Sequence, residues 1–201
     1  MNRLGGWVAR VAAVVGLALS LSACGINTVP RQDEQVKAAW SQVQNEYQRR
    51  SDLIPNLVNT VKGYAQQEKT VLTQVIEARA KATQTSVNLP PDVTSNPKAF
   101  QQFEQSQGQL TQALGRLMVV VERYPDLKSN QNFLALQSQL EGTENRIAVA
   151  RKDYIDSVQT YNTTLRTIPQ RWIAGIFYPD AKVKQTFSAP EPAQTAPHVS
   201  F

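Results

Sequence analysis

The feature that most constrains the fold is a stripe of apolar residues that recurs every three or four positions along most of the chain. Such spacing places the apolar side chains on one face of an α-helix. No part of the chain body shows the alternating pattern of a β-strand. The longest stripe lies near the carboxyl end and comprises Phe133, Leu136, Leu140, Ile147, Tyr154, Val158, Tyr161 and Leu165. We therefore predict an all-α protein.

Turn-forming residues divide the stripe into segments. The run Asn88-Leu89-Pro90-Pro91 ends one helix, and Asn96 followed by Pro97 is typical of the cap and first residue of the next. Tyr124-Pro125 and Ile168-Pro169 end two further helices, because the residue before a proline disfavours helical backbone. Long helices with short connections predict an antiparallel four-helix bundle. The alternative, an extended coiled coil with a partner chain, fits the aromatic residues of the stripe less well.

The first long segment contains Pro55, and two interpretations of it remain open. In one, Ser51 or Asp52 caps a second helix that has Pro55 in its first turn. The basic pair Arg49 and Arg50 then suits the negative end of the preceding helix. In the other, a single helix continues because the apolar stripe keeps its register, and the proline only kinks it.

The amino terminus has the features of an export signal. No acidic residue precedes position 24, and Arg3 and Arg10 flank a short apolar run at 11–21. That run is about half of the roughly 20 residues that a spanning helix needs. The sequence Leu21-Ser22-Ala23-Cys24 resembles the lipobox of bacterial lipoprotein precursors. The resemblance implies cleavage before Cys24 and its acylation, palmitate included; the alternative is an idle thiol after an ordinary cleavage site.

These signals predict five segments: a signal peptide at 1–23, a tether at 24–32, a helical bundle at 33–169, an apolar segment at 170–187 and a disordered tail at 188–201. The net charge of +5 is too small, and its basic residues too scattered, to indicate nucleic-acid binding. One cysteine excludes a disulfide within the chain, and one histidine leaves no common zinc set. We expect no cofactor and no metal.

Several motifs, in order along the chain, resemble the LemA family. They include Arg49-Arg50-Ser51-Asp52-Leu53-Ile54-Pro55-Asn56-Leu57-Val58, Val120-Val121-Glu122-Arg123-Tyr124-Pro125-Asp126-Leu127-Lys128, Gly142-Thr143-Glu144-Asn145-Arg146-Ile147-Ala148 and Tyr161-Asn162. The resemblance implies a helical bundle attached to the bacterial envelope by its amino terminus, without an established enzymatic activity. The chain departs from the family in having a lipobox where many relatives keep a transmembrane helix, and Gln67 where histidine is common.

Polar residues near two turns form the first candidate site. If the helices run alternately up and down, the turns at 51–63 and 124–130 lie at the same end of the bundle. We expect a partner-binding cluster there, made of Arg50, Asp52, Glu122, Tyr124 and Lys128. The alternative is local turn stabilisation by Asp52, Pro55, Pro125 and Asn130.

An aromatic patch after the last long helix forms the second candidate site. Aromatic residues with flanking cations suit a membrane interface. The patch comprises Trp172, Ile173, Ile176, Phe177 and Tyr178, beside Arg171, Lys182 and Lys184. The alternative is that this segment folds back over the end of the bundle.

We therefore expect a non-enzymatic scaffold or adaptor, anchored to a membrane through Cys24, that faces the periplasm or exterior and binds an unidentified envelope protein. Gly25, rather than Asp, after the cysteine favours the outer membrane in a bacterium with two membranes. The alternative is an enzyme or lipid-handling module with a carboxylate and arginine site inside the bundle, made of Glu77, Glu144 and Arg146.

Overall fold

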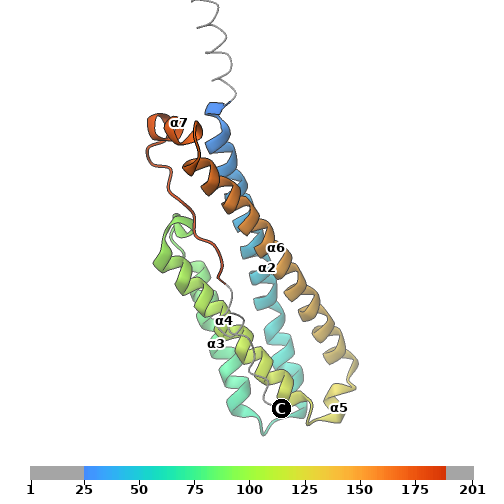
Figure 1. The fold of residues 1–201 in the computed structure, drawn as a ribbon. Helices are drawn as coiled ribbons and strands as arrows, with labels where there is room; N and C mark the ends of the chain where they lie inside the picture. The colour runs from blue at the N-terminus through green and yellow to red at the C-terminus, as the bar shows by residue number, and fades with distance from the viewer. Residues whose placement is uncertain (1–24, 189–201) are drawn as a thin grey trace, which may run out of the picture. The chain divides into compact units, whose positions relative to one another are not determined.

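The computed structural model describes residues 25–188, and the predictions for the signal peptide, Cys24 and the tail from 189 onward lie outside them. The described residues contain helices and no strand, which confirms the all-α class (Figure 1). The elements are α2 (Thr28–Tyr64), α3 (Lys69–Val87), the short 3-10 helix η1 (Val93–Ser95), α4 (Pro97–Val121), α5 (Pro125–Lys128), α6 (Gln131–Arg166) and α7 (Gln170–Phe177).

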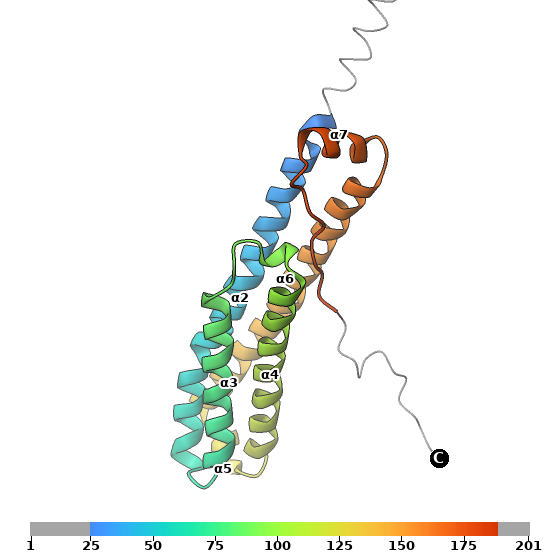
Figure 2. The same ribbon diagram turned by 90° about the vertical axis from the view of Figure 1, so that its left-hand side faces the viewer.

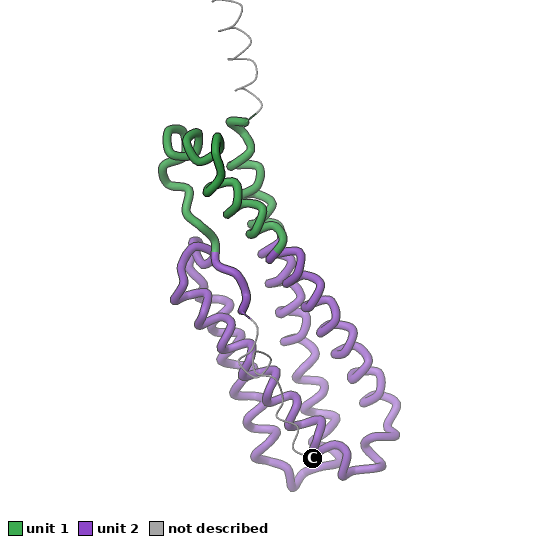
Figure 3. The backbone as a smooth tube through the Cα atoms, in the orientation of Figure 1, with its two compact units in different colours: residues 1–38, 156–184 green, residues 39–155, 185–201 purple. Residues whose placement is uncertain are grey.

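The described residues divide into two compact units (Figure 3). Unit 1 comprises residues 25–38 and 156–184, and unit 2 comprises residues 39–155 and 185–188. Helices α2 and α6 each contribute a segment to both units, whereas α3, α4 and α5 belong to unit 2 and α7 to unit 1.

Helix α2 runs without a break through Pro55, which decides between the two interpretations in favour of a single helix. Proline lacks the N–H that would bond to the carbonyl oxygen four residues earlier, here that of Ser51. In the structure the Nε of Arg79, from α3, donates to this Ser51 oxygen at 2.9 Å. Ile54 and Leu57 on either side of the proline are fully buried. A tertiary contact and the buried face thus compensate for the missing bond.

The expected tether at 24–32 and the helix start near Asp33 need correction, because α2 already begins at Thr28. The cause is Val29, which is buried and precedes the buried Val36 by seven residues, two helical turns. The apolar stripe therefore extends two turns further upstream than predicted.

The start of α4 and the interruption at Tyr124-Pro125 agree with the predictions, whereas α5 itself was not predicted as a helix. Helix α4 begins at Pro97, and the Oδ1 of its cap Asn96 accepts a hydrogen bond from the Ala99 amide at 3.2 Å. Helix α5 begins at Pro125, directly after the Tyr124-Pro125 stop signal. These boundaries follow local rules of capping and proline stereochemistry, so the sequence suffices to locate them.

The core of unit 2 is shared by five helices, α2 to α6, and Figures 1 and 2 show α3 and α4 side by side. Its fully buried members include Ile54, Leu57, Val75, Leu110, Leu117 and Leu127. A second apolar centre of unit 2 surrounds Trp40. The ring of Trp40 lies 5.0 Å from that of Phe103 and 5.3 Å from that of Tyr154, between ring centroids.

Residues 185–188, which we call the strap, complete this aromatic centre of unit 2. The Phe187 side chain is buried, 5.0 Å from the Phe100 ring, and the Arg151 guanidinium lies 4.3 Å from its centroid. The amide of Gln185 donates to the Thr94 oxygen at 2.7 Å, and the Tyr154 hydroxyl donates to the Gln185 oxygen at 2.8 Å. The last part of the 170–187 segment therefore packs on helices rather than remaining open to a membrane.

Unit 1 is held by polar contacts to the segment after α7. The Asn162 side chain both donates to the Lys184 oxygen, at 2.9 Å, and accepts from the Lys184 amide, at 2.8 Å. The Lys184 ammonium lies 2.8 Å from the carboxylate of Asp33 and 5.5 Å from the ring centroid of Tyr161. Burial raises the pKa of Tyr161 to about 12, so its hydroxyl is protonated at neutral pH.

Candidate functional site

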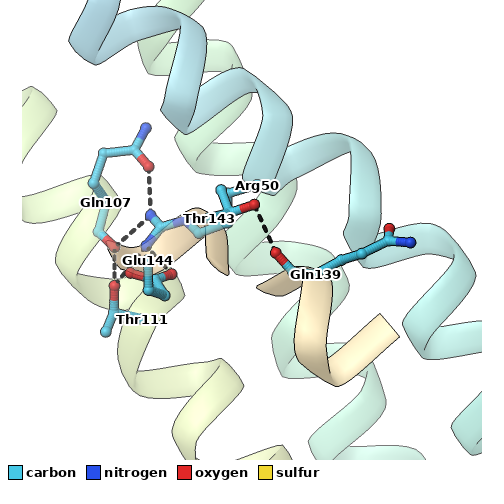
Figure 4. A network of polar contacts seen from close by, with 6 residues as sticks. All are labelled: Arg50, Gln107, Thr111, Gln139, Thr143 and Glu144. Carbon is cyan, nitrogen blue, oxygen red and sulfur yellow. Dashed lines mark hydrogen bonds and ion pairs between the residues drawn. The ribbon is translucent and has the colours of Figure 1, made fainter. Parts of the chain in front are cut away.

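Arg50 is the buried centre of a polar layer in unit 2 (Figure 4). This layer consists of Arg50, Gln107, Thr111 and Glu144. The Arg50 side chain is 1% exposed, because the residue occupies a position of the apolar stripe between Tyr47 and Ile54. The expectation that Arg49 and Arg50 mark a helix end is therefore wrong, since α2 continues to Tyr64.

The Arg50 guanidinium is held by acceptors on two other helices (Figure 4). Its Nη1 donates to the Thr111 hydroxyl at 2.9 Å and to Oε1 of Glu144 at 3.0 Å. Its Nη2 donates to Oε1 of Gln107 at 2.7 Å and to the Gln107 carbonyl at 3.3 Å. The Tyr47 ring lies 4.9 Å from the guanidinium carbon. A buried charge with several charge-assisted bonds stabilises one arrangement of α2, α4 and α6.

A hollow of about 540 Å³ lies between α4 and α6, next to this layer. It is lined by Thr111, Leu114, Gly115 and Met118 from α4 and by Gln137, Leu140, Glu141, Glu144 and Asn145 from α6. Thr111 and Glu144 line the hollow and also accept hydrogen bonds from Arg50. Arg50 therefore positions two residues of the hollow without lining it. The lining includes two carboxylates and no basic residue.

The residues of the expected carboxylate and arginine site lie in three different settings. Glu144 bonds to Arg50, whereas the Nε of Arg146 donates to Oε2 of Glu46 at 3.0 Å. Glu77 is exposed on α3 and lines a separate, shallow hollow of about 310 Å³. The three side chains therefore have separate partners or surroundings.

The residues of the expected partner-binding cluster likewise have different interaction partners. Lys128 donates to Glu122 at 2.6 Å, next to the α4–α5 turn. The Tyr124 hydroxyl donates to Glu68 at 3.0 Å, and this hydrogen bond is the main reason that the tyrosine pKa is raised. Asp52 is exposed and accepts a hydrogen bond from Gln48 at 2.7 Å. Arg50, by contrast, belongs to the buried layer.

Helix α7 exposes most of the predicted aromatic patch. Trp172, Ile176 and Phe177 are 62%, 74% and 55% exposed, and Ile173 and Tyr178 are partly buried. Of the three cations expected beside the patch, Arg171 and Lys182 are exposed, whereas Lys184 pairs with Asp33. Ala174 lies buried on the opposite side of the helix. One face of α7 thus packs against the rest of unit 1, and its apolar face is open to solvent.

Two residues that bond to Arg50, Gln107 and Thr111, were not predicted from the sequence. The sequence does contain an indication of the burial of Gln107. This residue lies between Phe103 and Leu110 in the apolar stripe of α4, where a polar side chain is unexpected. Thr143 of α6, also fully buried, interrupts the stripe between Leu140 and Ile147. Polar residues at stripe positions of several helices indicate a buried polar layer.

Metal-ligand clusters and membrane-spanning helices are both absent from residues 25–188. No group of three or more His, Cys, Asp or Glu side chains there could hold a metal ion. Within the same range, no helix combines the length and the apolar character that crossing a membrane requires.

Comparison with known proteins identifies relatives over most of the chain. The sequence model of the LemA family matches residues 39–201. Magnetosome protein MamQ 2 of Paramagnetospirillum magneticum is 27% identical over 169 residues, which cover 75% of this chain and 60% of that protein. Protein LemA of Metamycoplasma hominis is 23% identical over 141 residues, covering 70% of this chain and 59% of that protein. The chain thus spans about 60% of the length of the curated relatives it matches.

Proposed function

The chain belongs to the LemA family, and from this premise we propose that it is a non-enzymatic helical scaffold of the bacterial envelope, anchored to a membrane through acylated Cys24. The proposed scaffold is an antiparallel four-helix bundle of α2, α3, α4 and α6. The shared apolar core and the Arg50 layer, which joins α2, α4 and α6, support this arrangement.

The observation that carries the proposal is the exposed apolar face of α7. Trp172, Ile176 and Phe177 leave more than half of their surfaces open to water. Full burial of such a side chain contributes about 1.5–3 kcal/mol, so the α7 face adds to the anchoring that the acyl chains of Cys24 supply. Arg171 and Lys182 beside this face are suited to anionic headgroups.

A non-enzymatic role fits the chemistry of the Arg50 layer. A catalytic arginine must reach a substrate, whereas the Arg50 guanidinium is almost completely buried and already bonds to Gln107, Thr111 and Glu144. Such a group orders helices rather than stabilising a reacting charge.

Vesicle binding tests the α7 contact. Residues 24–201 with Cys24→Ala, which correspond to the proposed mature chain without acyl groups, are incubated with vesicles of phosphatidylglycerol and phosphatidylcholine, and the bound fraction is measured by sedimentation. We expect Trp172→Ser/Ile176→Ser to bind at least about tenfold more weakly, because two apolar contacts are lost. The control Val119→Ser removes an equally exposed apolar side chain from α4 and is expected to bind normally. Equal binding by all forms would refute the α7 contact.

Cell fractionation tests the anchor. The unaltered chain is expected in the membrane fraction and labelled by a palmitate analogue, and Cys24→Ala is expected to lose the label and to shift toward the soluble fraction. An unchanged distribution with no label in either form would refute acylation.

We also propose that the exposed residues near the α4–α5 turn bind an envelope protein. The pair Glu122 and Lys128 is exposed and ion-paired, so exchanging the two charges retains the pair but inverts the local surface. The double variant Glu122→Lys/Lys128→Glu is expected to keep its stability and to lose partners that co-purify with the unaltered chain. If it retains the same partners, this surface is not the contact.

A further inference from the structure

We propose that the hollow between α4 and α6 is a docking groove for a cationic amphipathic helix of a partner protein. This inference rests on the proposed scaffold function and specifies the chemistry of a partner. It concerns a surface of unit 2 that is separate from the Glu122 and Lys128 pair.

The groove offers an apolar contact surface with room beside it. Leu114 and Met118 from α4 face Leu140 from α6 across the hollow, and Met118 is partly buried. Methionine adapts its shape to different partners. Gly115 lies between the two α4 residues, and a Cβ added there would meet no heavy atom within 4 Å. The volume of about 540 Å³ is within the range of sites that bury several apolar groups.

The groove also has a defined charge. Glu141 and Glu144 are three positions apart on α6 and therefore lie on one side of the helix. Each carboxylate is held by a hydrogen bond, Glu144 from Arg50 at 3.0 Å and Glu141 from Gln137 at 2.9 Å. No Lys, Arg or His lines the hollow. Fixed carboxylates beside an apolar surface complement a helix that presents leucine-type side chains flanked by lysine or arginine.

Arg50 contributes by positioning rather than by contact. Its guanidinium ion-pairs with Glu144 and offsets that charge, so Glu141 supplies most of the negative charge of the groove. It orients Glu144 and Thr111, which form one end of the groove. The groove thus combines a rigid polar end with an adaptable apolar centre.

A peptide titration tests the proposal. The lipidated full chain in neutral phosphatidylcholine nanodiscs is titrated into a fluorescein-labelled 18-residue peptide of leucine and lysine in amphipathic helical order, and anisotropy is measured. Empty nanodiscs provide the background. A peptide of the same composition in scrambled order is the ligand control. We expect saturable binding of the amphipathic peptide and at least about tenfold weaker binding of the scrambled one.

Two glycine replacements distinguish the groove from the rest of α4. Gly115→Leu places a side chain inside the hollow, whereas Gly108→Leu makes the same change on the same helix at a residue that does not line it. Both glycines are exposed, and both replacements favour the helix, so neither is expected to unfold the chain. We expect Gly115→Leu to weaken binding at least about tenfold and Gly108→Leu to leave it within about twofold.

A charge variant tests the electrostatic part. Glu141→Gln is expected to weaken peptide binding about fivefold at low salt and less at high salt, since screening reduces the lost attraction. Equal effects of the two glycine variants, or equal binding of the scrambled peptide, would overturn the proposal. Loss of peptide binding when the chain itself dimerises would identify a second copy as the occupant and would also overturn it.

Failure of this proposal is distinguishable from failure of the scaffold function. The α7 and Cys24 experiments measure membrane attachment and do not involve α4 or α6 residues of the groove. Normal membrane attachment without peptide binding would refute the groove alone.

Discussion

Two tryptophans with opposite surroundings distinguish the two units. Trp40, in unit 2, is 6% exposed and contacts the rings of Phe100, Phe103, Tyr154 and Phe187. Trp172, on α7 in unit 1, is 62% exposed. Both residues lie on apolar faces of helices. An apolar face therefore predicts burial only where other elements cover it, and an uncovered face is the better indicator of binding.

The same contrast holds for charged residues. Arg50 is basic and buried, whereas its neighbour Arg49 is exposed. Local composition does not distinguish them, but their positions on the helix do, because successive residues are turned by about 100°. The buried member contacts three helices of the bundle, and the exposed one faces solvent.

Replacing the two tryptophans is expected to give the largest difference in the free energy of unfolding. Trp40→Ala is expected to lower the free energy of unfolding by about 4 kcal/mol, because it leaves a cavity among four aromatic rings. Trp172→Ala is expected to change it by no more than about 0.5 kcal/mol, as for other exposed sites. Urea denaturation followed by circular dichroism measures both. Similar losses would show that the α7 face is covered and would break the comparison.

The arginine pair gives the next largest difference. Arg50→Met is expected to lower the free energy of unfolding by about 3 kcal/mol, because Gln107 and Glu144 lose a charged partner. Arg49→Met is the matched control and is expected to stay within about 0.5 kcal/mol. If Arg50→Met were neutral or stabilising, the polar layer would serve specificity rather than stability.

Loss of the hydrogen bond between Tyr154 and the strap is expected to have a smaller effect on the free energy of unfolding. Burial raises the pKa of Tyr154, so its hydroxyl stays protonated at neutral pH and donates to the Gln185 oxygen. Tyr154→Phe removes this bond and is expected to cost about 1 kcal/mol. Hydrogen exchange of the Phe187 and Ser188 amides is expected to accelerate more than that of the α3 amides. A uniform change along the chain would show that the strap has no local stability of its own.

The smallest effect concerns Asp33 in unit 1. Its partial burial raises the carboxyl pKa, but hydrogen bonds and charge from Lys184 and Lys37 outweigh this and leave the pKa below the ordinary value of 3.8. The ion pairs of Asp33 therefore stabilise the fold fully at pH values above 3.8, and this stabilisation is lost as the pH falls through the lowered pKa. Asp33→Asn is expected to cost at most about 1 kcal/mol at neutral pH, since solvent screens the pair.

The pH dependence provides the check on Asp33. The stability difference between Asp33→Asn and the unaltered chain, from urea denaturation, should be constant from neutral pH down to about pH 5 and should decrease below about pH 4. A difference that persists unchanged at pH 2 would show that packing, rather than the ion pair with Lys184, is responsible.

Local chemistry explains which parts of the fold were predictable. The Asn96 cap, Pro97 at the start of α4 and the end of α4 before Tyr124-Pro125 follow from the backbone preferences of a few adjacent residues. The start of α2 was predicted too late, because a single buried residue, Val29, extends the helix upstream. The α7 residues were recognised as an apolar patch, and their sequence did not distinguish between exposure and burial.

Periodicity and capping signals established that the chain is helical, where α4 begins and which residues share a helical face, because these properties depend on neighbours within about four positions. The continuation of α2 through Pro55 depends on tertiary contacts, because Arg79 from another helix bonds to the Ser51 carbonyl. The burial of Arg50 and the exposure of Trp172 depend on tertiary contacts as well. Burial depends on residues tens of positions away, and periodicity does not specify which of them cover a given face.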